Sequence, residues 1–351
     1  MIKESIQLLV EHKDLTFEYA QQAMREIMNG EATPAQISAF LTSLRMKGET
    51  VNEVTAFAQV MREHAIHIAP RVQGRTVDTC GTGGDVIKTF NVSTAAAFVS
   101  AGAGITIAKH GNRSVTSKCG SADVLEAVGV NLNASPSTIE KTIEQIGIGF
   151  MFAPVFHPAM KNAIIPRREI GIRTVFNILG PLTNPASANA QVLGVYDAKL
   201  VEPMANVLQK LGLEEALVVH GMDGLDEISL IGKTKLAWLK AGQVSNQEIT
   251  PQDLKLKPAR MNQISGYDTQ ESARLMLNIL KGKWEEDARM QMVLVNAAAA
   301  LVVGGKAGDF VEGIELGRGA IASGKAYEKL TQLIRYTNGD QTKLARLESE
   351  K

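Results

Sequence analysis

Cysteine, net charge and long apolar runs are all scarce in this 351-residue chain, and each shortage excludes a class of protein. Cys80 and Cys119 are the only cysteines, too few for a disulfide framework and typical of a reducing compartment. Lys plus Arg equals Asp plus Glu, 37 each, so no overall field recruits nucleic acid or anionic lipid, and any phosphate site must be local. The longest apolar run, near residues 297–303, is too short to span a membrane, and residues 1–14 carry too many charges for a signal peptide. We therefore expect a cytoplasmic protein without nucleic-acid or membrane partners.

The pattern of apolar residues predicts two kinds of architecture in succession. With 45% hydrophobic and 21% charged residues the chain is an ordinary globular one, long enough for two domains. Residues 1–70 show helical spacing throughout and predict three helices without a strand, two of them opened by capping boxes at Thr33 and Thr50. From Arg75 onward strands alternate with helices, which is typical of a parallel sheet with helices on both faces. The predicted fold class is therefore α/β, with a small all-helical domain and a large α/β domain whose central sheet is mainly parallel.

A second helical stretch interrupts the alternation, from residue 157 to about 179. We expect it to fold back onto the N-terminal helices, so that residues 1–70 and about 157–190 form one discontinuous helical domain and residues 71–351 form the α/β domain. Strands follow near 192–196 and 216–220, with a helix between them. Beyond Lys233 the sequence predicts short strands, then four helices within 270–337, and a polar tail.

The stretch 77–121 holds the strongest chemical signal in the chain. Two strands, 76–80 and 105–108, each end in a polar loop that contains glycine, and a helix begins near Asn91 between them. Glycines in the loop 81–85 let backbone N–H groups approach an anion closely, and the helix start adds its own N–H groups and the positive end of its dipole. Hydroxyls of Ser93 and Thr94 and the charges of Lys109 and Arg113 complete a cradle for a polyphosphate. A glycine loop alone is equally often a tight turn, and the spacing fits neither a P-loop nor a dinucleotide fingerprint.

Four blocks of this stretch resemble the anthranilate phosphoribosyltransferase family: GTGGD (81–85), NVST (91–94), KHGNRSVTS (109–117) and GSADVLEA (120–127). Further blocks carry the resemblance along nearly the whole chain, including FAPVFHPAMKNA, RREIGIRTVFNILGPLTNPA and VVHGMDGLDEIS. The resemblance implies transfer of a phosphoribosyl group from phosphoribosyl pyrophosphate to the amine of anthranilate, with Mg²⁺ as cofactor. It also implies a homodimer formed through the helical domain.

The resemblance assigns site residues by position. Catalysis would be electrostatic and positional, through Lys109, Asn112 and Arg167, without a side-chain acid or base. Anthranilate would contact Gly81, Asn112 and Arg167. Phosphoribosyl pyrophosphate would contact Gly81, Gly84, Asp85, Thr89, Asn91, Val92, Ser93, Thr94, Lys109, His110, Gly111, Asn112, Arg113, Ser114, Val115, Thr116, Ser117 and Ser121.

The loop 223–227, Asp-Gly-Leu-Asp-Glu, directly follows a predicted strand. Adjacent carboxylates there suit Mg²⁺, although in isolation such a segment is more often a solvated acidic turn. Beside a pyrophosphate cradle the metal interpretation is favoured, because phosphoryl leaving groups travel with Mg²⁺. We expect Ser93, Asp226 and Glu227 to hold the ion.

Arginine and histidine near the site leave alternatives open. Arg167 could hold a flat carboxylate through its planar guanidinium or pair with Glu169 at the surface, and only the resemblance favours the first. His110 and His157 are more often hydrogen-bonded loop residues than bases, although His157 could line an aromatic pocket. Cys80 and Cys119 lack a partner pattern for nucleophilic catalysis.

Two other functions compete with the transferase. A pyrimidine nucleoside phosphorylase has a related fold and uses inorganic phosphate, whereas GTGGD with KHGNR and DGLDE favours the transferase. A non-catalytic nucleic-acid-binding paralogue is disfavoured by the balanced charge.

Overall fold

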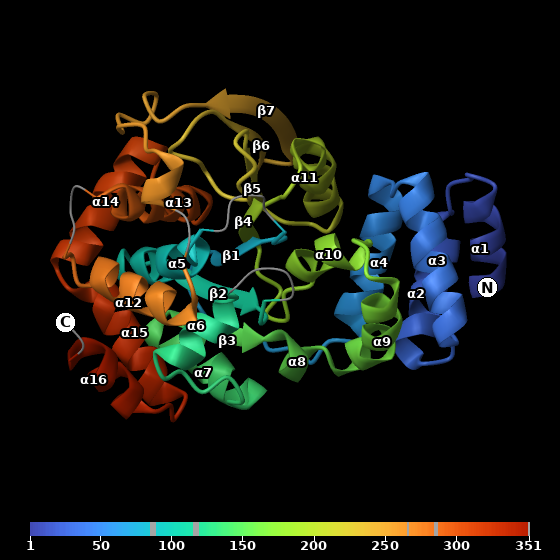
Figure 1. The fold of residues 1–351 in the computed structure, drawn as a ribbon, viewed down its shortest axis with the longest axis horizontal. Helices are drawn as coiled ribbons and strands as arrows, with labels where there is room; N and C mark the ends of the chain where they lie inside the picture. The colour runs from blue at the N-terminus through green and yellow to red at the C-terminus, as the bar shows by residue number, and fades with distance from the viewer. Residues whose placement is uncertain (85–88, 115–118, 265–266, 284–286, 350–351) are drawn as a thin grey trace.

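The computed structural model describes residues 1–84, 89–114, 119–264, 267–283 and 287–349, and within them a seven-stranded sheet has the order β3-β2-β1-β4-β5-β6-β7 (Figure 1). Strands β1 to β5 pair in parallel, and β6 and β7 are added beside β5 by antiparallel pairing. The prediction of a mainly parallel sheet is confirmed. The strands are β1 (Thr76–Gly81), β2 (Thr106–Gly111), β3 (Ile148–Phe152), β4 (Ala190–Gly194), β5 (Glu215–Gly221), β6 (Thr234–Lys240) and β7 (Gln243–Ile249).

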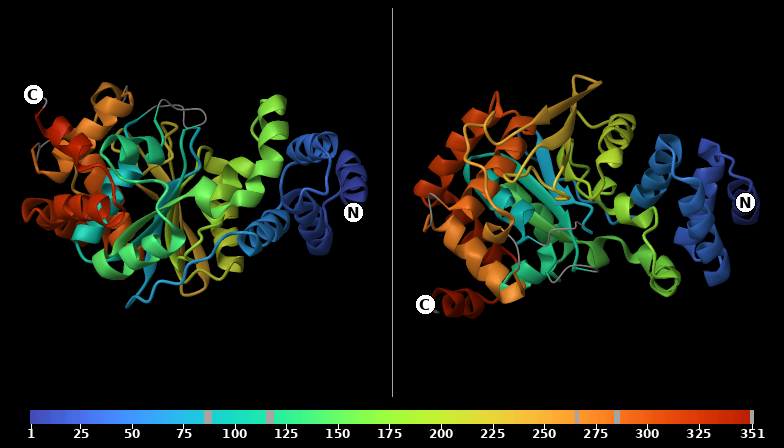
Figure 2. Two further views of the ribbon diagram at one scale, coloured as in Figure 1. Left: turned by 90° about the horizontal axis from the view of Figure 1, so that it is seen from below. Right: turned by 45° about the horizontal axis from the view of Figure 1, so that its top comes forward.

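Successive side chains of a strand point to opposite faces of the sheet. Both faces carry apolar side chains, and helices cover both of them. In β5, Leu217 and Val219 belong to the apolar cluster that includes α5 (Val92–Gly102) and α13 (Ala288–Val303). Ala216 and Val218 point the other way, into the cluster that includes α11 (Val201–Lys210). Figure 2 shows the sheet between these two layers. The other helices of the α/β region are α6 (Ser121–Ala127), α7 (Pro136–Ile146), α12 (Thr269–Leu280), α14 (Phe310–Ala322), α15 (Lys325–Tyr336) and α16 (Gln341–Ser349), together with the short 3-10 turns η3 (Ala198–Leu200) and η4 (Met261–Gln263).

The N-terminal region contains one helix more than the sequence predicts. Within residues 1–70 the structure has α1 (Ile2–Val10), α2 (Phe17–Asn29), α3 (Pro34–Lys47) and α4 (Val51–Glu63). The first predicted helix is broken after Glu11, and Thr16 starts α2 by accepting the N–H of Tyr19. Both predicted capping boxes are confirmed, with Gln36 and Glu53 as the reciprocal partners. α4 ends at Glu63, whereas the sequence predicts an end near His67.

The stretch predicted as helical from 157 to about 179 is a series of short helices. They are α8 (Ala153–Phe156), η1 (Pro158–Met160), α9 (Lys161–Ile170), α10 (Phe176–Leu179) and η2 (Gly180–Leu182). The stretch is divided after α9 because Gly171 ends that helix in the left-handed region, at φ +67°. α9 packs against α2 and α3, and the side chain of Asn162 donates to the carbonyl of Met28 at 2.8 Å.

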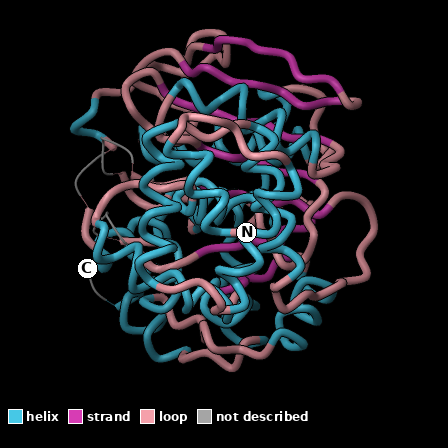
Figure 3. Tube along the Cα trace, turned by 90° about the vertical axis from the view of Figure 1, so that its right-hand side faces the viewer, coloured by secondary structure: helices cyan, strands magenta, loops and turns pink. Residues whose placement is uncertain are grey.

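The helical elements therefore gather at one end of the molecule, away from the C-terminus (Figure 1). Viewed from that end, helices lie in front of the strands (Figure 3). Their apolar cluster also takes in α11 and residues of β4 and β5, so the helical end rests on one face of the sheet. In the part of the chain that the structure describes, no helix has the length and apolar character needed to cross a membrane.

Candidate active site

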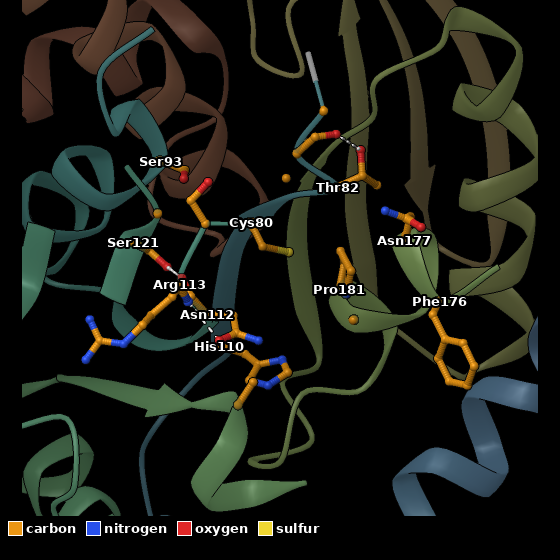
Figure 4. Close-up of a pocket in the computed structure, with 18 of the residues that line it drawn as sticks. Cys80, Thr82, Ser93, His110, Asn112, Arg113, Ser121, Phe176, Asn177 and Pro181 are labelled. Carbon is orange, nitrogen blue, oxygen red and sulfur yellow. Dashed lines mark hydrogen bonds between the residues drawn. The ribbon is translucent and has the colours of Figure 1, made fainter. Parts of the chain in front are cut away.

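A cavity of about 530 Å³ lies between the carboxyl edge of the sheet and the segment 153–183. One wall is built from the loops after β1 and β2 and the start of α5, and the other from α9, α10 and the turns beside them. Figure 4 shows Ser93 and Asn112 on one side of this space and Phe176 and Asn177 on the other. Parallel sheets bind ligands at this edge, where the chain crosses from one side of β1 to the other.

The glycine loop after β1 has the conformation that its sequence predicts. Gly83 and Gly84 have φ of +66° and +78°, a region that other residues rarely adopt. The N–H of Thr82 donates to Gly194 at 2.9 Å, and the N–H of Gly83 donates to the carboxylate of Asp226 at 2.9 Å. A Cβ at Gly81 would collide with the same carboxylate. The loop is thus packed directly against the acidic loop that follows β5.

The start of α5 is packed against the acidic loop in a similar way. Asn91 is its N-cap, and the N–H of Ser93 donates to Glu227 at 3.2 Å. The Ser93 hydroxyl accepts from the ammonium of Lys109 at 3.3 Å. Thr94 is buried within the helix and is not part of the cavity lining. The N–H donors predicted for phosphate therefore hold carboxylates in this structure.

Lys109 is buried at the base of the cavity. Its ammonium also donates to the carbonyl of Thr79, and burial lowers its pKa, while the nearby Asp78 opposes that shift. Arg113 lines the cavity, but its guanidinium is directed away from the helical wall, as Figure 4 shows, and pairs with Asp123 at 3.0 Å and Glu126 at 2.8 Å. Its charge is therefore already compensated on α6, whereas the sequence suggested that it would face a polyphosphate.

The remaining predicted phosphate contacts also meet at the cavity, apart from those outside the described residues. Asp85, Val115, Thr116 and Ser117 lie outside them. The lining contains Gly81, Gly84, Thr89, Asn91, Val92, Ser93, Lys109, His110, Gly111, Asn112, Arg113, Ser114, Ser121, Arg167, Asp226 and Glu227. One cavity thus brings together residues from loops more than a hundred positions apart in the sequence.

Arg167 lies on the helical wall, with its guanidinium 4.9 Å from the centre of the Phe176 ring. Burial lowers the pKa of this guanidinium. No carboxylate of the described residues forms an ion pair with Arg167, so the alternative pairing with Glu169 is not present. A half-buried guanidinium without a counter-charge favours binding of an anion, and its planar fork matches a carboxylate.

His110 and His157 form a buried pair, with ring centres 4.9 Å apart. Burial is the main cause that lowers the pKa of His110 to about 3 and that of His157 to about 4. Both rings line the cavity and are neutral at pH 7. Groups with such low pKa values are weak bases, and the structure therefore gives neither histidine the role of a strong general base.

Several residues of the site were missed from the sequence. Arg173 lies over the ring of Tyr196 at 4.5 Å and donates to the carbonyl of Gly84 at 2.5 Å, and Phe176 and Asn177 line the helical wall. Arg173, Phe176 and Asn177 belong to the block RREIGIRTVFNILGPL, whose resemblance to the family was the signal that could have indicated them. The sequence did not show that this block packs against the glycine loop.

The acidic loop suits Mg²⁺ in its chemistry. The described residues contain no group of three or more His, Cys, Asp or Glu side chains that could enclose a metal. Asp226, Glu227 and Ser93 nevertheless present hard oxygen atoms to one cavity. Mg²⁺ is commonly held by one or two carboxylates and completes its shell with water and substrate phosphates, so this donor set fits the ion.

Comparison with known proteins gives the same result along the whole chain. Residues 73–327 match the model of a glycosyl transferase family α/β domain, and residues 3–65 match the helical bundle domain of that family. An anthranilate phosphoribosyltransferase of Persephonella marina is 50% identical over 339 residues, which cover 97% of this chain and all of the relative. The chain belongs to the anthranilate phosphoribosyltransferase family.

Solved structures of the family have the same fold. The anthranilate phosphoribosyltransferase of Thermus thermophilus matches with a TM-score of 0.89 at 39% identity, over 95% of this chain and 99% of that one. The Saccharomyces cerevisiae protein, in complex with phosphoribosyl pyrophosphate and Mg, matches with a TM-score of 0.88 at 28% identity, over 96% and 98%. The same yeast protein in complex with 4-fluoroanthranilate gives a TM-score of 0.86 at 27% identity, over 96% and 97%.

Proposed function

We propose that the chain transfers the phosphoribosyl group of 5-phosphoribosyl 1-pyrophosphate to the amine of anthranilate, the second step of tryptophan biosynthesis. The amine nitrogen bonds to C1, the bond from C1 to the pyrophosphate oxygen breaks, and one amine proton is released. The observation that carries the proposal is the two-sided cavity: phosphate-type N–H donors on the sheet wall face an uncompensated Arg167 guanidinium on the helical wall. The yeast relative, whose structures hold this donor and an analogue of this acceptor, supports the same assignment.

The sheet wall is the proposed donor subsite. Backbone N–H groups of the glycine loop and the start of α5 would bind the pyrophosphate, with their preset geometry stabilising the charge that develops on it. Lys109 adds a buried positive charge beside Ser93. The same role is proposed for the predicted contacts outside the described residues, Asp85 and 115–117, and for the loop 109–114 with Ser121.

Asp226, Glu227 and Ser93 would hold Mg²⁺. The bound ion would neutralise part of the charge on the departing pyrophosphate, a contribution that metal ions commonly make to phosphoryl leaving groups. The chain's own part is to keep both carboxylates at the mouth of the glycine loop, where Gly81 lets Asp226 approach closely.

The helical wall is the proposed acceptor subsite. Arg167 would bind the anthranilate carboxylate, and Asn112 and Gly81 would orient the ring toward C1, a positioning contribution. The aniline nitrogen of anthranilate is neutral at pH 7, so attack requires no strong base, in agreement with the low pKa values of His110 and His157.

We also propose that residues 1–70 with 157–190 act as one domain and residues 71–351 as the other. Each would carry one substrate, and closure of the cavity would exclude water that could hydrolyse the activated sugar. The hydrogen bond from Arg62 to the carbonyl of Leu182, at 2.7 Å, supports the union of the two helical segments.

A homodimer through the helical domain completes the proposal. Val10, Met46, Ile164 and Ile165 are all more than half exposed, at 61%, 73%, 53% and 52%, although they are large and apolar. Such residues are common at protein interfaces. Sedimentation should show a dimer, and Met46→Glu should weaken it; a monomer at micromolar concentration would contradict this part of the proposal.

The function is tested by the fluorescence of anthranilate during incubation with phosphoribosyl pyrophosphate and Mg²⁺. We expect a loss of signal that requires the donor, stops with EDTA and releases one pyrophosphate per anthranilate. Well-folded protein that consumes no anthranilate would refute the proposal. Phosphorolysis of a pyrimidine nucleoside by inorganic phosphate would then point to the phosphorylase, and a gel shift with single-stranded DNA to the nucleic-acid-binding alternative.

A further inference from the structure

The ladder between β1 and β2 ends early, directly beneath the cavity. These strands pair at Thr76 with Thr106 and at Val77 with Ile107, and no further. With their other neighbours they remain paired to their carboxyl ends, β1 with β4 and β2 with β3. β1 and β2 therefore separate at the carboxyl ends of the strands, where the site is built.

Three buried side chains take the place of the missing ladder. The carboxylate of Asp78 accepts the N–H of His110 at 3.1 Å, and the ammonium of Lys109 donates to the carbonyl of Thr79. Asn184 joins the two strands, because its amide donates to both Ala108 and the second carboxylate oxygen of Asp78, each at 2.8 Å. The separated backbone groups are thus satisfied by side chains, as buried polar groups must be.

Asp78 also supplies negative charge to a region that holds a buried cation. Asp78 is fully buried, Lys109 is 4% exposed, and Asp78 is the main charge that favours the ammonium form of Lys109. Glu227 contributes less, and Cys80 is a neutral thiol because burial raises its pKa well above the ordinary value. Asp78 fixes the backbone N–H of His110, the residue next to Lys109, while Lys109 reaches back to the carbonyl of Thr79, so the position of Lys109 depends on this carboxylate. Lys109 lines the cavity, whereas Asp78 and Asn184 do not.

We propose that Asp78 is a positioning residue for the transfer reaction, which acts through Lys109 by holding β1 and β2 apart and compensating the Lys109 ammonium at the donor subsite. No sequence motif marks Asp78 as part of the site. The proposal rests on the proposed function for its kinetic readout, and binding of magnesium pyrophosphate gives a second readout that does not need turnover.

Asp78→Asn tests the proposal, because it removes the charge and also the acceptor for Asn184, while the amide oxygen can still accept the N–H of His110. We expect kcat/KM for phosphoribosyl pyrophosphate to fall by about ten- to a hundredfold, with KM for anthranilate changed less than about threefold. In calorimetry, magnesium pyrophosphate should bind about tenfold more weakly. The proposal is overturned if KM for anthranilate rises by as large a factor as kcat/KM for phosphoribosyl pyrophosphate falls. It is also overturned if the binding of magnesium pyrophosphate is unchanged.

Glu215→Gln is the matched control. Glu215 is also a buried strand carboxylate, and Arg75 and Trp238 donate hydrogen bonds to it. It is the first residue of β5, so it lies at the end of the strands away from the cavity. The control should lose stability and keep its kinetic constants within about twofold. A parallel loss of kcat/KM in the control would show that destabilisation alone explains the effect and would refute the specific role.

The double variant Asp78→Asn, Lys109→Met asks whether Asp78 acts through Lys109. If it does, adding Asp78→Asn to Lys109→Met should reduce kcat/KM by less than about threefold, because residues that act as a unit are not additive. A full additional loss of kcat/KM would overturn the proposal.

If Asp78→Asn does not fold, Asn184→Ala replaces it as the test. Asn184→Ala removes only one contact of the carboxylate and should give a smaller loss of kcat/KM, confined to phosphoribosyl pyrophosphate. If the wild type binds pyrophosphate but transfers nothing to anthranilate, the proposed function fails, and the binding data alone decide the role of Asp78.

Discussion

Asp226 accepts the N–H of Gly83 at 2.9 Å, so a carboxylate occupies a donor that the sequence suggests for phosphate. Glu227 accepts the N–H of Ser93 at the start of α5 in the same manner. An incoming pyrophosphate must therefore displace negative groups of the protein itself. A cation that attracts these carboxylates would release the donors at the same time, which explains why metal and pyrophosphate should bind together.

Removing the Asp226 carboxylate should have opposite effects with and without metal. For Asp226→Asn in EDTA, we expect pyrophosphate to bind about tenfold more tightly than to the wild type, because a neutral amide oxygen holds the N–H of Gly83 more weakly than the carboxylate does. With Mg²⁺ present, the same variant should bind pyrophosphate more weakly, since a metal ligand is lost. Isothermal titration calorimetry under both conditions measures the two changes.

Asp223→Asn is the control for this experiment. Its carboxylate lies in the same loop but accepts from Ser229 and from the N–H of Leu225, not from the glycine loop. If charge alone mattered, both variants would bind metal-free pyrophosphate more tightly. We expect the gain only for Asp226→Asn, and weaker binding of Asp226→Asn under both conditions would contradict the internal-competitor account.

The buried histidine pair should make stability depend on pH. The folded pKa values of about 3 for His110 and about 4 for His157 lie below the ordinary value near 6.5, so folding favours the neutral rings. Their contribution to stability is present above pH 6.5 and is lost as the pH falls toward 4. Asp78, whose pKa burial raises to about 6, opposes this trend between its ordinary value and pH 6.

Each histidine contributes a slope of up to about 1.4 kcal/mol per pH unit in that window. His157→Gln should therefore flatten the dependence of the unfolding free energy on pH between 5 and 6 by up to this amount, measured by urea unfolding. A His157→Gln slope equal to that of the wild type would show that the ring is not held neutral by the fold.

Lys47 and Glu53 form a buried ion pair in the helical region, 2.9 Å apart. Glu53 is fully buried and also accepts the N–H groups of Leu15 and Thr50, so it joins the break after α1 to the start of α4. Lys47→Met leaves this carboxylate without its cation and should cost about 3–5 kcal/mol. Lys13→Met breaks only an exposed pair with Glu11 and should leave the unfolding free energy nearly unchanged. Similar losses in chemical denaturation would contradict the importance of burial.

Local patterns predicted much of the fold. Capping boxes at Thr33 and Thr50, and apolar runs at β3 and β5, depend on residues close together in sequence, and their elements form where expected. The break at Glu11 was missed, because the tertiary contact of Glu53 with Leu15 fixes the chain after α1. The early end of α4 was also missed, and just beyond it the N–H of Ile66 donates to the carbonyl of Phe156 at 2.8 Å. Helix spacing alone does not reveal such contacts.

The sequence predicted those parts of the candidate site that a local motif marks. The glycine loop and the acidic loop each carry their own signal, and both line the cavity. Asp78 and Asn184 carry none, since a lone buried aspartate in a strand looks like any polar residue until the separation of β1 from β2 is seen. The orientation of Arg113 was also unpredictable, because Asp123 and Glu126 compete with a ligand for it.

The central claim is that one cavity holds donor and acceptor on opposite walls, and Arg167→Ala tests it most directly. Loss of a charge-assisted contact of roughly 1.5–3 kcal/mol should raise KM for anthranilate by about ten- to a hundredfold and leave KM for phosphoribosyl pyrophosphate within about twofold. The neighbouring exposed Arg168→Ala should change neither constant. Equal increases in both KM values for Arg167→Ala, or the same increases for Arg168→Ala, would contradict the account.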